Sequence, residues 1–130
     1  MRTNSARRRA TTCTALAAAG LSALAVTSAA AAPPGTVVDR ASASGDYAVA
    51  SAQGSIRRPK ALYVRLMGGV QSGTIIVGCA RGGSTSANAY SRTKAGVYGI
   101  PIKPRGADVC DVTAGVGGSG RVVVEIRAVR

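Results

Sequence analysis

The stretch RVVVEIRAV, residues 121–129, decides the fold class of this chain. Its residues alternate between a wholly apolar set and a set that carries both charges: Val122, Val124, Ile126 and Ala128 against Val123, Glu125, Arg127 and Val129. A period of two is typical of a β-strand with one face in a core and one face in solvent. The stretch therefore predicts a strand that buries Val124 and exposes Glu125 and Arg127.

The same alternation recurs upstream, and no segment after residue 31 has a helical period. It predicts strands at residues 36–38, 47–52, 61–67, 74–80, 96–103 and 108–114, with residues 84–92 as an edge strand or a loop. Breaks are predicted at Gln53-Gly54, Gly68-Gly69, Gly82-Gly83 and the glycine-rich stretch 115–120. Six to seven short strands in one small domain predict an all-β, two-layer β-sandwich.

The first 31 residues have the pattern of a cleavable export signal. Basic residues come first (Arg2 and Arg7-Arg8-Arg9), an uncharged stretch rich in Ala and Leu follows, and small residues end it. Cleavage is predicted after Ala30 or Ala31, because cleavage after Ala32 would place Pro33 next to the cut. The general secretory route is favoured narrowly over the twin-arginine route. The chain thus divides into a signal (1–31), a Pro/Gly/Ser-rich leader with at most a short first strand (32–45) and a sandwich domain (46–130).

Two cysteines remain once the signal, which contains Cys13, is removed. Cys79 and Cys110 are 31 positions apart, and an exported protein folds where disulfides form. A bridge between them would stabilise the fold by ~3–4 kcal/mol through loop entropy; two free thiols are the alternative, and two cysteines without histidine make a poor zinc site. Two candidate strands separate the cysteines. A Greek key, which returns a fourth strand beside the first, would bring them together.

The cysteine segments resemble the two cysteine strands of immunoglobulin domains. TIIVGC, residues 74–79, is similar to the first, and GADVCDV, residues 106–112, is similar to the second. The chain departs from that family in having no Trp to pack on the bridge and Asp108 where a corner tyrosine would stand. The resemblance implies an immunoglobulin-like shape and carries no function with it.

Composition argues against catalysis. The chain has no histidine, and its five acidic residues include one close pair, Asp108 and Asp111, whose positions three apart point to opposite sides of a strand. No catalytic residue, metal site or cofactor is predicted. The absence of Trp and Phe disfavours a sugar platform and a dedicated nucleic-acid binder. Among the tyrosines, Tyr90 is predicted to be the most exposed and Tyr98 to lie in the core.

Charge is the strongest functional signal. Removal of the four signal arginines leaves 13 of the 17 basic residues and all five acidic residues, which gives a net charge of +8. Two clusters stand at predicted turns: Arg57, Arg58 and Lys60, then Lys103 and Arg105. They are either solvated loops, contacts for an anionic polymer, or reactive-site loops of a serine-protease inhibitor.

These features together predict a secreted, extracellular, monomeric and non-enzymatic β-sandwich with no stable membrane insertion after cleavage. Its expected partner is an anionic polymer of the cell envelope or a secreted protein, with no specific nucleic acid. The alternatives are a protease inhibitor and a carrier of a small ligand between its sheets.

Overall fold

The computed structural model describes residues 33–130; the predicted signal and its cleavage site lie outside them. These residues form an all-β fold of five strands: β3 (Thr36–Arg57), β4 (Ala61–Arg81), β5 (Ser84–Arg92), β6 (Gly96–Ile100) and β7 (Val109–Val129). All pairs are antiparallel and belong to one sheet, in the order β3-β7-β4-β5, with β6 paired to β4. None of the described residues forms a helix long and apolar enough to cross a membrane.

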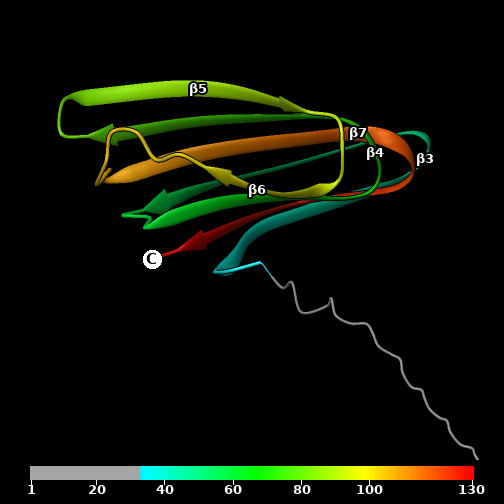
Figure 1. Cartoon of the computed structure of the whole chain (residues 1–130), viewed down its shortest axis with the longest axis horizontal. Coiled ribbons are helices and arrows are strands. Elements are labelled where there is room, and N and C mark those ends of the chain that lie inside the picture. Colours follow the sequence, from blue (N-terminus) through cyan, green and yellow to red (C-terminus); the bar gives the residue numbers. More distant parts are fainter. Residues whose placement is uncertain (1–32) are drawn as a thin grey trace, which may run out of the picture. The chain divides into compact units, whose positions relative to one another are not determined.

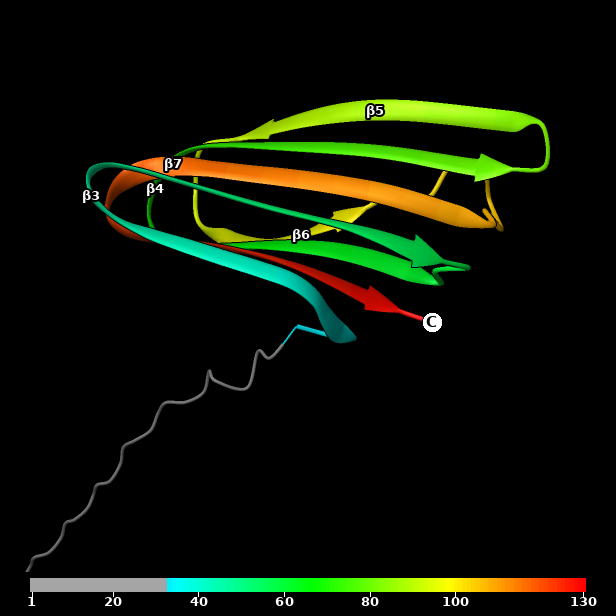
Figure 2. The ribbon, with the colours of Figure 1, turned by 180° about the vertical axis from the view of Figure 1, so that it is seen from behind.

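The sheet folds over on itself because its three longest strands bend at the same end (Figure 1). The first half of β3 pairs with the second half of β7, and the second half of β3 with the first half of β7. β4 divides its pairing with β7 in the same way. The first halves of β3 and β4, the second half of β7 and β6 thus form one layer, called the β6 layer. The other halves and β5 form the β5 layer, and Figure 2 shows the two from behind.

Glycines allow the bend. Gly68 has a φ of +89°, and a Cβ added to Gly69 or Gly118 would overlap the backbone of the facing strand. The backbones of β4 and β7 therefore touch where the sheet turns, which only residues without side chains permit. The breaks predicted at 68–69 and 115–120 are wrong. These glycines bend continuous strands and do not end them.

This bend carries a prediction. We expect Gly118→Ala to lower the free energy of unfolding by about 2–3 kcal/mol, because the new Cβ would overlap the Gly69 carbonyl oxygen and force the strands apart. Gly115→Ala, on the same strand, is the control, since its Cβ would meet only the Ala50 carbonyl oxygen at 3.9 Å. Urea unfolding of both variants measures the difference, and equal stabilities would contradict the assigned bend.

β3 is longer than the sequence predicts. Gln53-Gly54 lies inside it and makes no turn, since Val38 from the first half of the strand fills the space above Gly54. The Gln53 backbone N–H donates to Asp39 Oδ2 at 2.9 Å, which joins the two halves at the sheet edge. The segment predicted as a leader before residue 46 therefore contributes from Thr36 onward to the sheet, and six to seven short strands are replaced by five, three of them long.

The core lies between the layers and follows the predicted alternation. Val122, Val124 and Ile126 are fully buried there, against small residues of β3 and apolar residues of β4. β5 and β6 each pair only with β4, so both are edge strands. β7 returns beside β4, as the Greek-key hypothesis requires, but β6 pairs with the first half of β4 and not with β5. A simple Greek key is therefore not confirmed.

The predicted disulfide is present. Cys79 and Cys110 face each other directly in the register of β4 and β7, their Cα atoms are 4.1 Å apart, and their sulfur atoms are bonded. Both residues belong to the buried core, at 4% and 0% exposure. The bridge thus ties together the two strands that organise the β5 layer.

The outer face of the second half of β7 differs from the prediction. Glu125 is only 2% exposed, because Arg40 and Arg127 both bind its carboxylate, at 3.2 and 2.8 Å. Arg127 also donates hydrogen bonds to the carbonyl oxygens of Pro34 and Gly35, at 3.3 and 2.9 Å. The arginines and the segment before β3 thus lie over this face. The predicted exposure of Glu125 is wrong, and Arg127 is a structural residue.

Arg127→Ser is accordingly expected to cost about 2–3 kcal/mol of stability. An exposed arginine would cost less than ~1 kcal/mol, but here the change leaves a buried carboxylate with half of its partners. Arg121→Ser removes the same charge from an exposed position of the same strand and serves as the control. Thermal and urea unfolding give the comparison. A loss no greater than that of the control would show that the Glu125 cluster does not support the fold.

Candidate functional site

Three chain connections meet at the end of the molecule opposite the bend, called here the loop end. They are residues 58–60 between β3 and β4, 82–83 between β4 and β5, and 101–108 between β6 and β7. Asp108 joins them. Its N–H donates to the Ala80 carbonyl oxygen at 2.7 Å, its own carbonyl oxygen accepts from the Arg58 N–H at 2.9 Å, and its Oδ2 accepts from the Gly82 N–H at 3.0 Å.

Asp108 is therefore a structural residue of the loop end. It keeps an exposed position, yet it is bonded to backbone groups of the other two connections and of β4. Asp111, its neighbour in the sequence, lies on β7 opposite Ser55 and Gly78. In the part of the chain that the structure describes, no three His, Cys, Asp or Glu residues gather as metal ligands would.

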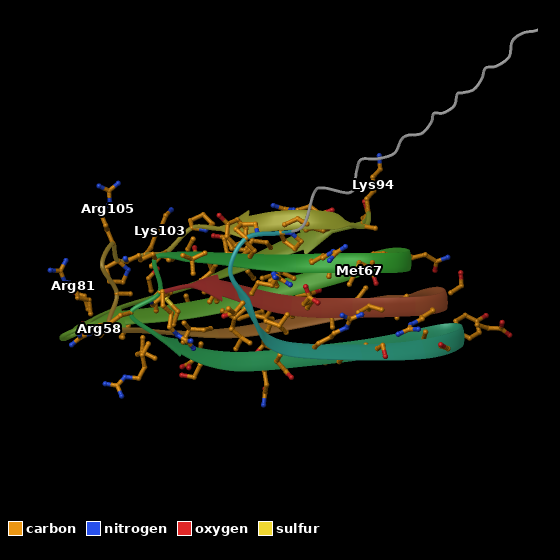
Figure 3. All side chains as sticks on the ribbon, turned by 90° about the horizontal axis from the view of Figure 1, so that it is seen from below. Arg58, Met67, Arg81, Lys94, Lys103 and Arg105 are labelled. Carbon is orange, nitrogen blue, oxygen red and sulfur yellow. A yellow bond between two sulfur atoms is a disulfide. The ribbon has the colours of Figure 1, made fainter. Side chains whose placement is uncertain are left out.

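The basic residues predicted as contacts all lie at the loop end and are exposed. Arg57 ends β3, Arg58 and Lys60 follow it, and Lys103 and Arg105 belong to the connection before β7. Figure 3 shows Arg58, Lys103 and Arg105 gathered at this end, with Arg81 among them and Lys94 at the far end. We call Arg58, Lys60, Arg81, Lys103 and Arg105 the basic loop cluster.

No carboxylate neutralises this cluster by direct contact. Over residues 33–130, the ion pairs are those that Arg40 and Arg127 form with Glu125. Arg81 Nη1 instead donates to the Arg105 carbonyl oxygen at 3.1 Å, which joins the end of β4 to the connection before β7. The cluster thus presents positive charge on a frame fixed by backbone hydrogen bonds.

Two adjoining depressions hollow the loop end. The larger is an open groove of about 650 Å³ whose lining includes Lys60, Tyr63, Gly99 and Arg105. The smaller, of about 390 Å³, is lined by Arg58, Lys60, Arg81 and Asp108 among others. Lys60 lines both. A ligand in the larger depression would contact cations of two connections, Lys60 and Arg105. A ligand in the smaller one would contact cations of one connection and of the end of β4.

Arg81 is the member of the cluster that sequence reasoning missed, although a signal for it existed. A disulfide between Cys79 and Cys110 on antiparallel strands brings residues just after the first cysteine close to residues just before the second. Arg81 and Asp108 each lie two residues from their cysteine, on those sides. The bridge alone would have placed Arg81 beside the connection that holds Arg105.

The tyrosines are arranged differently from the prediction. Tyr47 is 95% exposed, whereas Tyr90, predicted as the most exposed, is partly buried. Tyr98 packs against the core as predicted. Tyr90 and Tyr98 both contact the Arg92 guanidinium, whose carbon lies 5.9 and 5.1 Å from the two ring centres. The faces of these two rings therefore already contact a cation of the protein itself.

Comparison with known proteins gives a distant likeness in shape. No family model and no curated protein matches the chain. Among solved structures, it is similar to TmCBM61, a carbohydrate-binding module solved in complex with β-1,4-galactotriose, with 11% identity and a TM-score of 0.39. The match covers 65% of this chain and 63% of that chain. No functional residue is transferred from it.

Proposed function

We propose that the protein is a secreted, non-catalytic interaction module that binds an anionic polymer at or near the cell envelope. The observation that supports this function is the basic loop cluster. Two connections, 58–60 and 101–108, and the end of β4 bring its cations to one end of the molecule. No carboxylate pairs with them among residues 33–130. Unpaired charges gathered on one surface attract a polyanion and release its counterions on binding.

The rigidity of the frame favours binding further. Asp108 and the Arg81–Arg105 hydrogen bond hold the connections in place before any ligand arrives. Cations held on a fixed backbone lose less conformational freedom on binding than cations on mobile loops. A polymer that passes across both depressions would meet several of them in succession.

The inhibitor alternative is not favoured by the geometry of the first cluster. A reactive-site loop must present an extended backbone with free N–H and C=O groups to its protease. Arg58 has a φ of +50°, its N–H is bonded to Asp108, and the Lys60 N–H is bonded to Val129. The carrier alternative gains no support either, since the inward faces of the two layers pack into a single apolar cluster.

Paired charge removals test the proposed function. We expect Lys60→Ser/Arg105→Ser to weaken binding to polygalacturonate or long-chain polyphosphate at least ~10-fold at low salt. The slope of log affinity against log salt should become shallower by up to about two, because each lost contact releases one counterion fewer. Binding isotherms of the full chain between about 20 and 200 mM salt provide both quantities.

The matched control is Lys94→Ser/Arg121→Ser, which removes one lysine and one arginine. Lys94 lies at the far end of the molecule (Figure 3), and Arg121 lies at the bend, where its backbone faces Gly68. This control should leave the slope unchanged and the affinity within about threefold, because charges beyond a Debye length contribute little. If the two double variants weaken binding equally, net charge and not the loop end attracts the polymer. If neither polymer binds in a salt-dependent way, the proposed function is wrong.

A further inference from the structure

The larger groove contains an aromatic ring beside its cations. Tyr63 lies on the first half of β4, pointing away from the core, since its neighbours Leu62 and Val64 are buried. Its cross-strand partners are Arg127 on one side and Gly99 of β6 on the other. The groove therefore joins an aromatic residue of the sheet surface to Lys60 and Arg105 of the loop end.

Gly99 leaves space beside the ring. A Cβ added to Gly99 would lie 3.9 Å from Tyr63 Cε1, so the tyrosine ring rests next to a position without a side chain. The ring is partly exposed. The groove thus offers an apolar ring surface to a ligand.

The two cations complete the chemistry of the groove. Lys60 and Arg105 come from different connections, are exposed, and pair with no carboxylate in the described part of the chain. Arg127, the charged neighbour of Tyr63, is bound to Glu125 and is not available to bind a ligand. A matching ligand has a flat ring with an apolar side and carries an acidic group beside it.

We propose that this groove binds one sugar unit of an acidic polysaccharide. The apolar side of the sugar ring packs on Tyr63, and its acidic group binds Lys60 and Arg105. This inference rests on the proposed function and names the class of polymer. A polyphosphate has no ring to place on Tyr63. A single-stranded nucleic acid stacks successive bases on several aromatic side chains, whereas Tyr63 is the aromatic residue of this groove, and Tyr90 and Tyr98 hold Arg92.

The test separates ring packing from charge. With the full chain, Tyr63→Ala should weaken binding to polygalacturonate about 5–20-fold and leave binding to polyphosphate unchanged, a change expected from the loss of one stacking contact. The salt slope should stay the same, because no charge is removed. Tyr63→Phe should retain most of the affinity.

Gly99→Val provides a second variant that does not remove the tyrosine. The added Cβ lies at ordinary contact distance from the ring. The two methyl groups beyond it occupy the space beside the ring, on an edge strand that tolerates a β-branched residue. This variant should reduce polygalacturonate binding and leave polyphosphate binding and the melting temperature unchanged. Effects of Tyr63→Ala and Gly99→Val that are absent, or equal for the two polymers, overturn the inference.

The outcomes distinguish this inference from the function on which it rests. Lys60→Ser/Arg105→Ser could weaken binding to both polymers while Tyr63→Ala affects neither. The loop end then binds polyanions without recognising the sugar ring, and only the inference fails. If poly(U) loses at least as much affinity as polygalacturonate on Tyr63→Ala, the ring stacks bases, and the acidic-polysaccharide assignment is overturned. If no polyanion binds in a salt-dependent way, both fail.

Discussion

Replacing Val124 by Asp is expected to unfold the domain. Val124 is fully buried in the second half of β7, where it pairs with Ala41 of β3 and Leu66 of β4. An ionised carboxylate at this point would lose its hydration without gaining a partner, and protonating it would still leave a polar group unpaired. The cost of several kcal/mol compares with a total stability of about 5–15 kcal/mol for a domain of ordinary size.

Val49→Asp is the matched control, since Val49 is 74% exposed on β3. It should fold with a stability within about 1 kcal/mol of the unchanged protein. Circular dichroism and urea unfolding of the two variants give the comparison. A folded Val124→Asp variant with the same midpoint would mean that β7 does not place this residue between two layers.

The alternation of apolar and polar residues predicts which faces of β4 and β7 are buried. Burial of a face depends only on which of its residues are apolar. The second half of β7 and both halves of β4 are strands as predicted, and Val122, Val124 and Ile126 lie in the core. In β4 the buried residues also follow a period of two: Leu62, Val64, Ile75 and Val77. What alternation could not predict was how far each strand continues. Continuity depends on partners remote in the sequence, and those partners become known only when the sheet is assembled.

Glycine shows why the number of strands was wrong. The same residue permits a turn that ends a strand and a close approach that bends one. Gly82-Gly83 ends β4, whereas Gly68-Gly69 bends it, and their sequences give no reason for the difference. The reason lies in β7, whose backbone at Ser119 and Arg121 faces Gly69 and Gly68 across the bend.

The candidate site was predicted in its residues but not in its assembly. The sequence predicts two exposed clusters, Arg57, Arg58 and Lys60 and then Lys103 and Arg105, because proline and charge together mark exposed turns. The groove that joins Lys60 and Arg105 to Tyr63 was not foreseen, since it requires the pairing of β4 with β6. The burial of Glu125 was missed for a similar reason, as Arg40 lies 85 residues away in the sequence.

Cys110→Ser is expected to lower the free energy of unfolding by 2–5 kcal/mol, the usual cost of removing a disulfide from a small domain. The bridge links two cysteines separated by 31 positions, so breaking it gives the unfolded chain the freedom of that loop, worth ~3–4 kcal/mol in the entropic account. The serine hydroxyl would also occupy a position with 0% exposure.

A double replacement separates these two contributions. Cys79→Ala/Cys110→Ala also removes the bridge but buries no new polar group, so it should be less destabilised than a variant with a buried serine. Intact-mass measurement of the unchanged protein should show two protons added on reduction, with both thiols open to alkylation only then. If both thiols are free in the native protein, the bridge does not form. If they are bridged but the double variant keeps its full stability, the paired strands β4 and β7 hold the β5 layer without it.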